Sequence, residues 1–91
     1  LDTVGIYAFN KNDPRAAEIY EHIKQMALSH KFVSQIHGFY LDEEKRSISF
    51  DVIVDFAAPD MEATFRAVCK QVRAAYPNYT LIITRDSDYS G

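Results

Sequence analysis

The stretch Phe32 to Phe56, FVSQIHGFYLDEEKRSISFDVIVDF, is the segment around which the rest of this chain is arranged. Two runs rich in β-forming residues flank a short charged segment, which is the pattern of a β-hairpin. In the second run apolar side chains occupy every other position, so in a strand they share one face: Ile48, Phe50, Val52, Val54 and Phe56. Serine and aspartate fill most of the alternate positions. The segment therefore predicts a hairpin with one apolar face and one polar face.

The register of this hairpin follows from the charged turn. We predict a three-residue loop, 43–45, which places Ile36 opposite Val52 and His37 opposite Asp51. A slip of one residue would turn the apolar side chains of one strand away from the core, so this register is favoured. The polar face is expected to carry an imidazole and a carboxylate on neighbouring strands.

Length and composition fit a single domain over residues 1–91, with 47% hydrophobic and 25% charged residues. The net charge of −3, with scattered basic residues, argues against nucleic acid as a partner, because phosphate binding needs a cluster of Lys and Arg. The lone Cys69 excludes an internal disulfide and a CxxC motif, and we expect it to be a core filler. No apolar run approaches the roughly 18 residues of a membrane span, and no signal-peptide pattern is present.

The remaining segments alternate between strand and helix patterns. Asp-Pro or Pro-Asp pairs stand where each of two helices is expected to begin, at residues 13–14 and 59–60. Apolar residues then recur at helical spacing. The expected elements are a strand at Val4–Phe9, a helix from about Pro14 to about Ser29, the hairpin, a helix from about residue 60 to Tyr76-Pro77-Asn78, and a strand at Tyr79–Arg85 before a polar tail.

The order β-α-β-β-α-β predicts an α+β fold, the ferredoxin-like sandwich, in which two helices cover one face of a four-stranded antiparallel sheet with strand order 4-1-3-2. Each helix has one apolar stripe, so the second face of the sheet is expected to stay uncovered. Phe39 and Ile53 would be apolar residues on that open face. We therefore expect a homodimer that covers them.

His37 and Asp51 are candidate ligands for zinc or a similar divalent ion, since imidazole and carboxylate both bind such metals. Further carboxylates, Asp86 and Asp88, follow the last strand. In the order 4-1-3-2 that strand lies three spacings from His37, roughly 14 Å, so bending or a second copy would have to close the gap. From these residues alone an ordinary cross-strand polar pair is the favoured interpretation.

Other kinds of site are not supported by the sequence. His22 and His30 are eight residues apart on different helical faces, so we do not expect them to share a metal. No nucleophile stands beside a base, and no glycine-rich phosphate loop occurs. We therefore expect that the domain is not an enzyme.

Three strings and a turn resemble one known family: residues 33–39 (VSQIHGF), residues 48–52 (ISFDV), Tyr76-Pro77, and residues 82–86 (IITRD). In this order and spacing they look like the cytoplasmic C-terminal domain of cation diffusion facilitator transporters, membrane proteins that exchange protons for zinc, iron or manganese. The resemblance implies a ferredoxin-like homodimeric domain, attached to a transmembrane domain, that senses divalent metal near its dimer interface.

The resemblance also implies a ligand set. His37, Asp51 and Asp86 match positions where the family domain binds metal. Thr84 stands where the family often has a further histidine, and a threonine hydroxyl is a poor replacement for imidazole. The alternative is a free-standing regulatory domain of the ACT type, which shares the topology and binds amino acids. Residues 10–14 lack the glycine-rich loop usual in that class.

Overall fold

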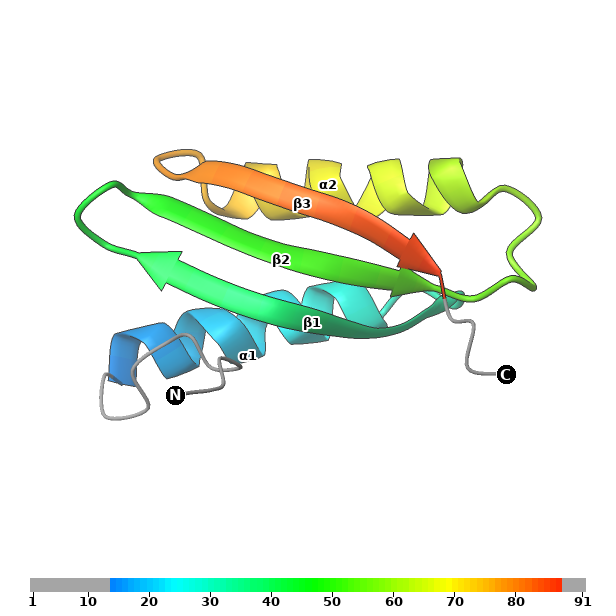
Figure 1. Cartoon of the computed structure of the whole chain (residues 1–91), viewed down its shortest axis with the longest axis horizontal. Coiled ribbons are helices and arrows are strands. Elements are labelled where there is room, and N and C mark those ends of the chain that lie inside the picture. Colours follow the sequence, from blue (N-terminus) through cyan, green and yellow to red (C-terminus); the bar gives the residue numbers. More distant parts are fainter. Residues whose placement is uncertain (1–13, 88–91) are drawn as a thin grey trace.

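The structure is a computed structural model that describes residues 14–87. The predicted strand Val4–Phe9 and Asp88 lie outside the described residues. Within them the element order is helix, two strands, helix and strand: α1 (Pro14–Leu28), β1 (Val33–Asp42), β2 (Ser47–Val54), α2 (Met61–Ala75) and β3 (Thr80–Ser87). Both helices lie on one face of the sheet (Figure 1), as predicted.

The hairpin between β1 and β2 is antiparallel, and the predicted register is confirmed at its centre. Ile36 pairs with Val52, and His37 pairs with Asp51. The predicted three-residue loop is wrong, because Asp42 pairs with Ser47 and leaves the four residues 43–46 in the loop. Arg46 takes a positive φ of 52°, which closes this longer turn.

A β-bulge absorbs the extra residue. Between His37 and Tyr40, two residues of β1 face one residue of β2, and the first of them, Gly38, has a φ of +65°. Glycine is the residue that adopts this left-handed conformation without steric cost, so the bulge forms there. From Phe39 onward the side chains of β1 are shifted by one position relative to a regular strand.

The bulge moves Phe39 to the helix side of the sheet. Phe39 is only 3% exposed, and its ring meets that of Tyr20 in α1 edge-on at a centroid distance of 5.2 Å. The prediction that Phe39 lies on the open face is therefore wrong. The core on the helix side is built from both helices and all three strands, with Phe50, Ile23, Ile48, Val52, Val54, Val68 and Val72 as its largest fully buried side chains.

The sheet also differs from the predicted one in strand number, strand order and direction. The described residues form three strands in the order β1-β2-β3, and β3 pairs with β2 in parallel. The four-stranded antiparallel sheet with order 4-1-3-2 is therefore wrong for this part of the chain. β2 is the central strand, which agrees with its continuous buried run Val52, Ile53 and Val54. The helix α2 makes the crossover that a parallel pair requires.

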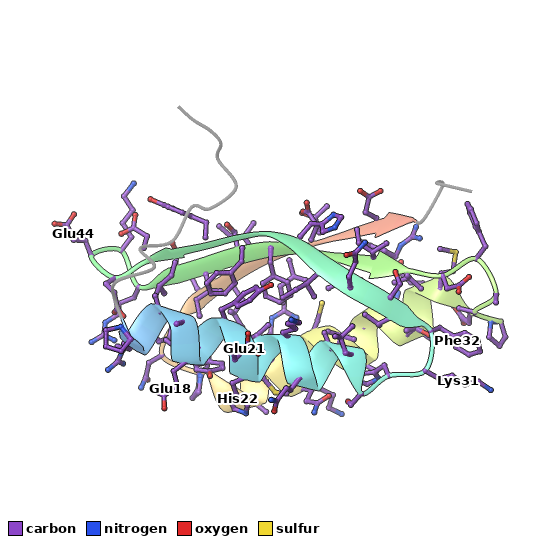
Figure 2. The ribbon with its side chains drawn as sticks, turned by 90° about the horizontal axis from the view of Figure 1, so that it is seen from below. Glu18, Glu21, His22, Lys31, Phe32 and Glu44 are labelled. Atoms are coloured by element: carbon purple, nitrogen blue, oxygen red, sulfur yellow. The ribbon has the colours of Figure 1, made fainter. Side chains whose placement is uncertain are left out.

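The helices follow the predicted pattern closely. In α1 the residues Ala16, Ile19, Ile23 and Ala27 are buried at helical spacing. Asp60 caps α2, because its carboxylate accepts a hydrogen bond of 3.0 Å from the backbone N–H of Ala63. Figure 2 views the molecule with the sheet above and both helices beneath it. Within residues 14–87 neither helix is long and apolar enough to cross a membrane.

Candidate functional site

The sheet face opposite the helices brings together side chains from all three strands. Partner residues on neighbouring strands project to the same side, so the register fixes which side chains lie next to one another. We call this surface the open sheet face; its described residues are Gln35, His37, Tyr40, Ser49, Asp51, Ile53, Ile82, Thr84 and Asp86. In Figure 1 it faces the viewer, with both helices behind it.

One row across this face carries the predicted ligand pair. His37 is the partner of Asp51, and Asp51 is in turn the partner of Thr84. Because β3 lies beside β2, it is two strand spacings from the strand of His37, about 10 Å, and not the three spacings expected from the sequence. Thr84, which stands where the family named above often has a histidine, is therefore a direct neighbour of Asp51.

Asp86 lies in the next row, where it is the partner of Ile53. Such a diagonal arrangement separates its Cα from that of Asp51 by about 7–8 Å and from that of His37 by about 12 Å. No hydrogen bond or ion pair joins the side chains of His37 and Asp51. Among residues 14–87 no three His, Cys, Asp or Glu side chains come close enough to hold a metal ion. The described part of one copy thus places His37 next to Asp51 but does not bring a third ligand close to them.

The bulge shapes the space around the Asp51 carboxylate. A Cβ atom added at Gly38 would lie 3.4 Å from Asp51 Oδ2, so this carboxylate oxygen sits directly against the backbone of β1. Bulges often lie next to functional sites, where they redirect a side chain. Sequence reasoning missed this feature, although a glycine in a strand interior is its usual signal.

Of the two apolar residues predicted for the open sheet face, Ile53 lies on it but is only 5% exposed, and Phe39 belongs to the core. The exposed apolar side chains are Tyr40 at 45% and Ile82 at 56%, which flank Ser49 in one row. They lie one row away from His37 and Asp51, so an apolar strip borders the candidate ligands.

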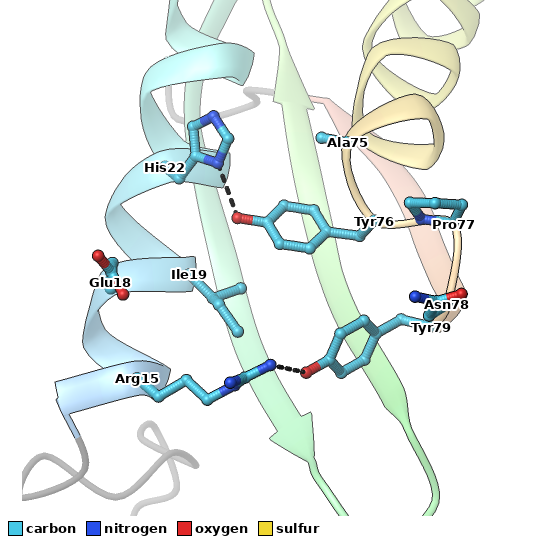
Figure 3. A pocket seen from close by; sticks show the side chains of 9 residues that line it. All are labelled: Arg15, Glu18, Ile19, His22, Ala75, Tyr76, Pro77, Asn78 and Tyr79. Atoms are coloured by element: carbon cyan, nitrogen blue, oxygen red, sulfur yellow. Dashed lines mark hydrogen bonds between the residues drawn. The ribbon is translucent and has the colours of Figure 1, made fainter.

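A hollow of about 510 Å³ lies between α1 and the turn that joins α2 to β3 (Figure 3). Its walls include Ile19, Ala75, Pro77 and the rings of two tyrosines. A hydrogen bond of 2.7 Å joins His22 Nδ1 to Tyr76 Oη. Burial raises the pKa of Tyr76 above its ordinary value, and the negative charge of Glu18 adds to this effect.

The second tyrosine of this hollow is held by an ion pair. Arg15 Nε lies 3.1 Å from Glu43 Oε2, while Tyr79 Oη donates to the other carboxylate oxygen at 3.2 Å. Arg15 Nη2 in turn donates to Tyr79 Oη at 3.4 Å. Sequence reasoning assigned no role to these residues, because they come from α1, the β1–β2 loop and the α2–β3 turn and approach one another only in the folded chain.

His22 lies in α1 and His30 lies just after its C-terminal end, and the two have separate partners. His22 contacts Tyr76, whereas His30 Nε2 lies 2.8 Å from Gln71 Oε1 on α2. His22 and His30 thus lie in different surroundings.

Comparison of the chain with protein families, with curated proteins and with solved structures gives no match. The functional conclusion therefore depends on the residues and their geometry.

Proposed function

We propose that this chain is the cytoplasmic dimerisation and metal-sensing domain of a divalent metal cation/proton antiporter of the cation diffusion facilitator type. The three sequence segments that resemble that family lie in the three strands of the sheet. Residues 33–39 lie in β1, residues 48–52 in β2 and residues 82–86 in β3. The resemblance thus concerns the surface on which the candidate ligands His37, Asp51 and Asp86 are displayed.

The observation that carries the proposal is the register pairing of His37 with Asp51, with no third His, Cys, Asp or Glu of residues 14–87 close enough to share a metal ion with them. Zinc in proteins generally takes three or four protein ligands. In a two-fold symmetric dimer the same surface is used by both copies, so each side would contribute one His37 and one Asp51. Two copies would then supply the four ligands that one copy lacks.

The proposed mechanism is regulation through dimer geometry. Carboxylates of Asp51 and Asp86 from two copies repel one another when they approach, and a divalent cation between them removes this repulsion. Zinc, iron or manganese would therefore stabilise a closed arrangement of the two domains relative to an open one. This bias would pass to the transmembrane domain of the parent transporter, where transport itself takes place.

Calorimetric titration with zinc, manganese or iron(II) tests the ligand role of Asp51. The substitution Asp51→Ala should weaken metal binding by more than about tenfold. Loss of an outer-shell partner already costs at least that much affinity, and Asp51 is proposed to bind the metal directly. Its melting temperature should stay close to that of the wild type, since the Asp51 side chain makes no hydrogen bond within the described residues. Glu44→Ala, which removes an exposed carboxylate from the hairpin loop, is the matched control.

A second variant tests the same site by adding a ligand. Thr84 is the partner of Asp51 on β3, so Thr84→His would place a second imidazole beside the carboxylate. Because imidazole binds zinc far better than a hydroxyl does, this variant should bind zinc more tightly than the wild type. Unchanged zinc affinity in both Asp51→Ala and Thr84→His would contradict the proposed site.

The hollow beside Tyr76 favours a second candidate function, a regulatory domain that binds a small amino acid. Its volume of about 510 Å³ is typical of small-molecule sites. Arg15 and Glu18 line it with opposite charges, which match the two charged groups of an amino acid. A panel of free amino acids should then raise the melting temperature, and Tyr76→Phe should reduce that increase. No stabilisation by any of them would exclude this candidate.

A further inference from the structure

The helix α2 carries a basic stripe on its outer side. Arg66, Lys70 and Arg73 are spaced by four and three residues, so they lie on one side of the helix. The helix has three basic residues but only one acidic residue, Glu62, in a chain whose net charge is −3. This helix is thus locally basic in a chain whose net charge is negative.

The stripe borders a hollow of about 310 Å³ between α2 and β3. The hollow is lined by the three basic side chains and by Phe65, Cys69 and Ile83. No acidic side chain lines it. Its volume is at the lower end of the range for small-molecule sites, and it combines apolar walls with a few charged groups, as such sites do. We call it the α2–β3 hollow.

Two of the three cations have no counter-ion within the described part of the chain. Glu62 is shared, because its carboxylate oxygens lie 3.5 Å from Arg66 Nε and 3.6 Å from Arg85 Nε. Neither Lys70 nor Arg73 makes an ion pair there. An ammonium and a guanidinium are therefore available at the rim of a partly apolar hollow. Charge-assisted hydrogen bonds to phosphate or carboxylate are the strong interactions that such groups make.

We propose that the α2–β3 hollow binds a small phosphate ester whose anionic group lies between Lys70 and Arg73 and whose apolar part lies against Phe65 and Ile83. A phosphate monoester fits better than a carboxylate, because it carries nearly two negative charges at neutral pH and three acceptor oxygens. The ester can be a free metabolite or the headgroup of an acidic lipid, since both present the same chemistry. This inference does not depend on the proposed metal site, which lies on the opposite face of the sheet.

Cys69 provides a reporter for this test. It is the single cysteine of the chain, it lines the hollow, and it is 6% exposed. The rate of its alkylation by a small maleimide should fall several-fold when short-chain phosphatidic acid, below its micellar concentration, occupies the hollow. Inorganic phosphate at the same concentration should protect less, because it lacks an apolar part.

Substitutions at the rim test which groups hold the anion. Lys70→Ala and Arg73→Ala should each raise the concentration needed for half-protection by about tenfold, as expected when a charge-assisted hydrogen bond is lost. Lys45→Ala, which removes the same charge from the hairpin loop, should leave it unchanged. Burial raises the pKa of the Cys69 thiol while Arg73 lowers it, so protection is measured as the ratio of rates with and without ester in each variant.

Vesicles separate the two sources of the ester. Protection by phosphatidylcholine vesicles that contain phosphatidic acid, but not by phosphatidylcholine alone, would assign a lipid headgroup. Protection only by the dissolved ester would assign a free metabolite. Absence of protection by either probe, or equal protection in wild type, Lys70→Ala and Arg73→Ala, would overturn the proposal.

Discussion

Gly38 decides which side chains of β1 face the helices and which face the open side. With a φ of +65° it starts the bulge, and the next residue, Phe39, enters the core. The same bulge leaves Tyr40 on the open sheet face and places backbone against the Asp51 carboxylate. A single residue thus couples the packing of the hairpin to the geometry of the candidate metal site.

Substitution of Gly38 tests this coupling. Gly38→Ala should lower the free energy of unfolding by about 1–2 kcal/mol, because a side chain with a Cβ atom resists the left-handed conformation. Gly38→Asn should cost less, since asparagine tolerates that conformation better. Urea unfolding of the two variants gives both values. An alanine variant as stable as the wild type would show that β1 has no bulge at this position.

At the scale of the strand, the bulge predicts a sharp contrast between two neighbouring aromatic residues. Phe39 is buried against Tyr20, so Phe39→Ala should cost about 3–5 kcal/mol in the free energy of unfolding. Tyr40 is 45% exposed on the other face, so Tyr40→Ala should cost well under 2 kcal/mol. Thermal and urea unfolding measure both. A regular strand, without the bulge, would give the reverse order of costs.

The elements themselves could be predicted from the sequence because their signals are local. Helical spacing of apolar residues and the Asp60 cap located α1 and α2, and the alternation in residues 48–54 located β2. These element predictions depend only on side-chain period and on burial of one face. The pairing of His37 with Asp51 was predicted from a three-residue loop. It holds because the extra residue of the observed loop is offset by the bulge at Gly38.

The position of β3 could not be predicted in the same way. Its sequence shows that it is a strand, but its neighbour depends on where α2 crosses the sheet, which is a non-local property. The assumed four-stranded order placed β3 too far from the strand of His37, whereas it pairs directly with β2. The exposed apolar residues Tyr40 and Ile82 were missed for a related reason, since they lie together only in the observed register.

At the scale of the whole molecule, the two helices leave one face of the described sheet without a helical layer. That face combines the exposed apolar side chains of Tyr40 and Ile82 with the candidate ligand pair of His37 and Asp51. Each copy carries a net charge of −3, so two copies repel at long range. A divalent cation bound between them would reduce this repulsion and add ligand bonds across the interface.

Analytical ultracentrifugation with and without zinc, manganese or iron(II) measures the mass of the domain in solution and shows whether metal promotes a dimer. We expect a dimer whose dissociation constant falls when metal is added. Ile82→Lys should shift it to a folded monomer, whereas Leu28→Lys, which changes an apolar side chain 39% exposed on α1, should not. A monomer at every metal concentration, or a dimer unaffected by Ile82→Lys, would contradict the claim that two copies meet through the open sheet face.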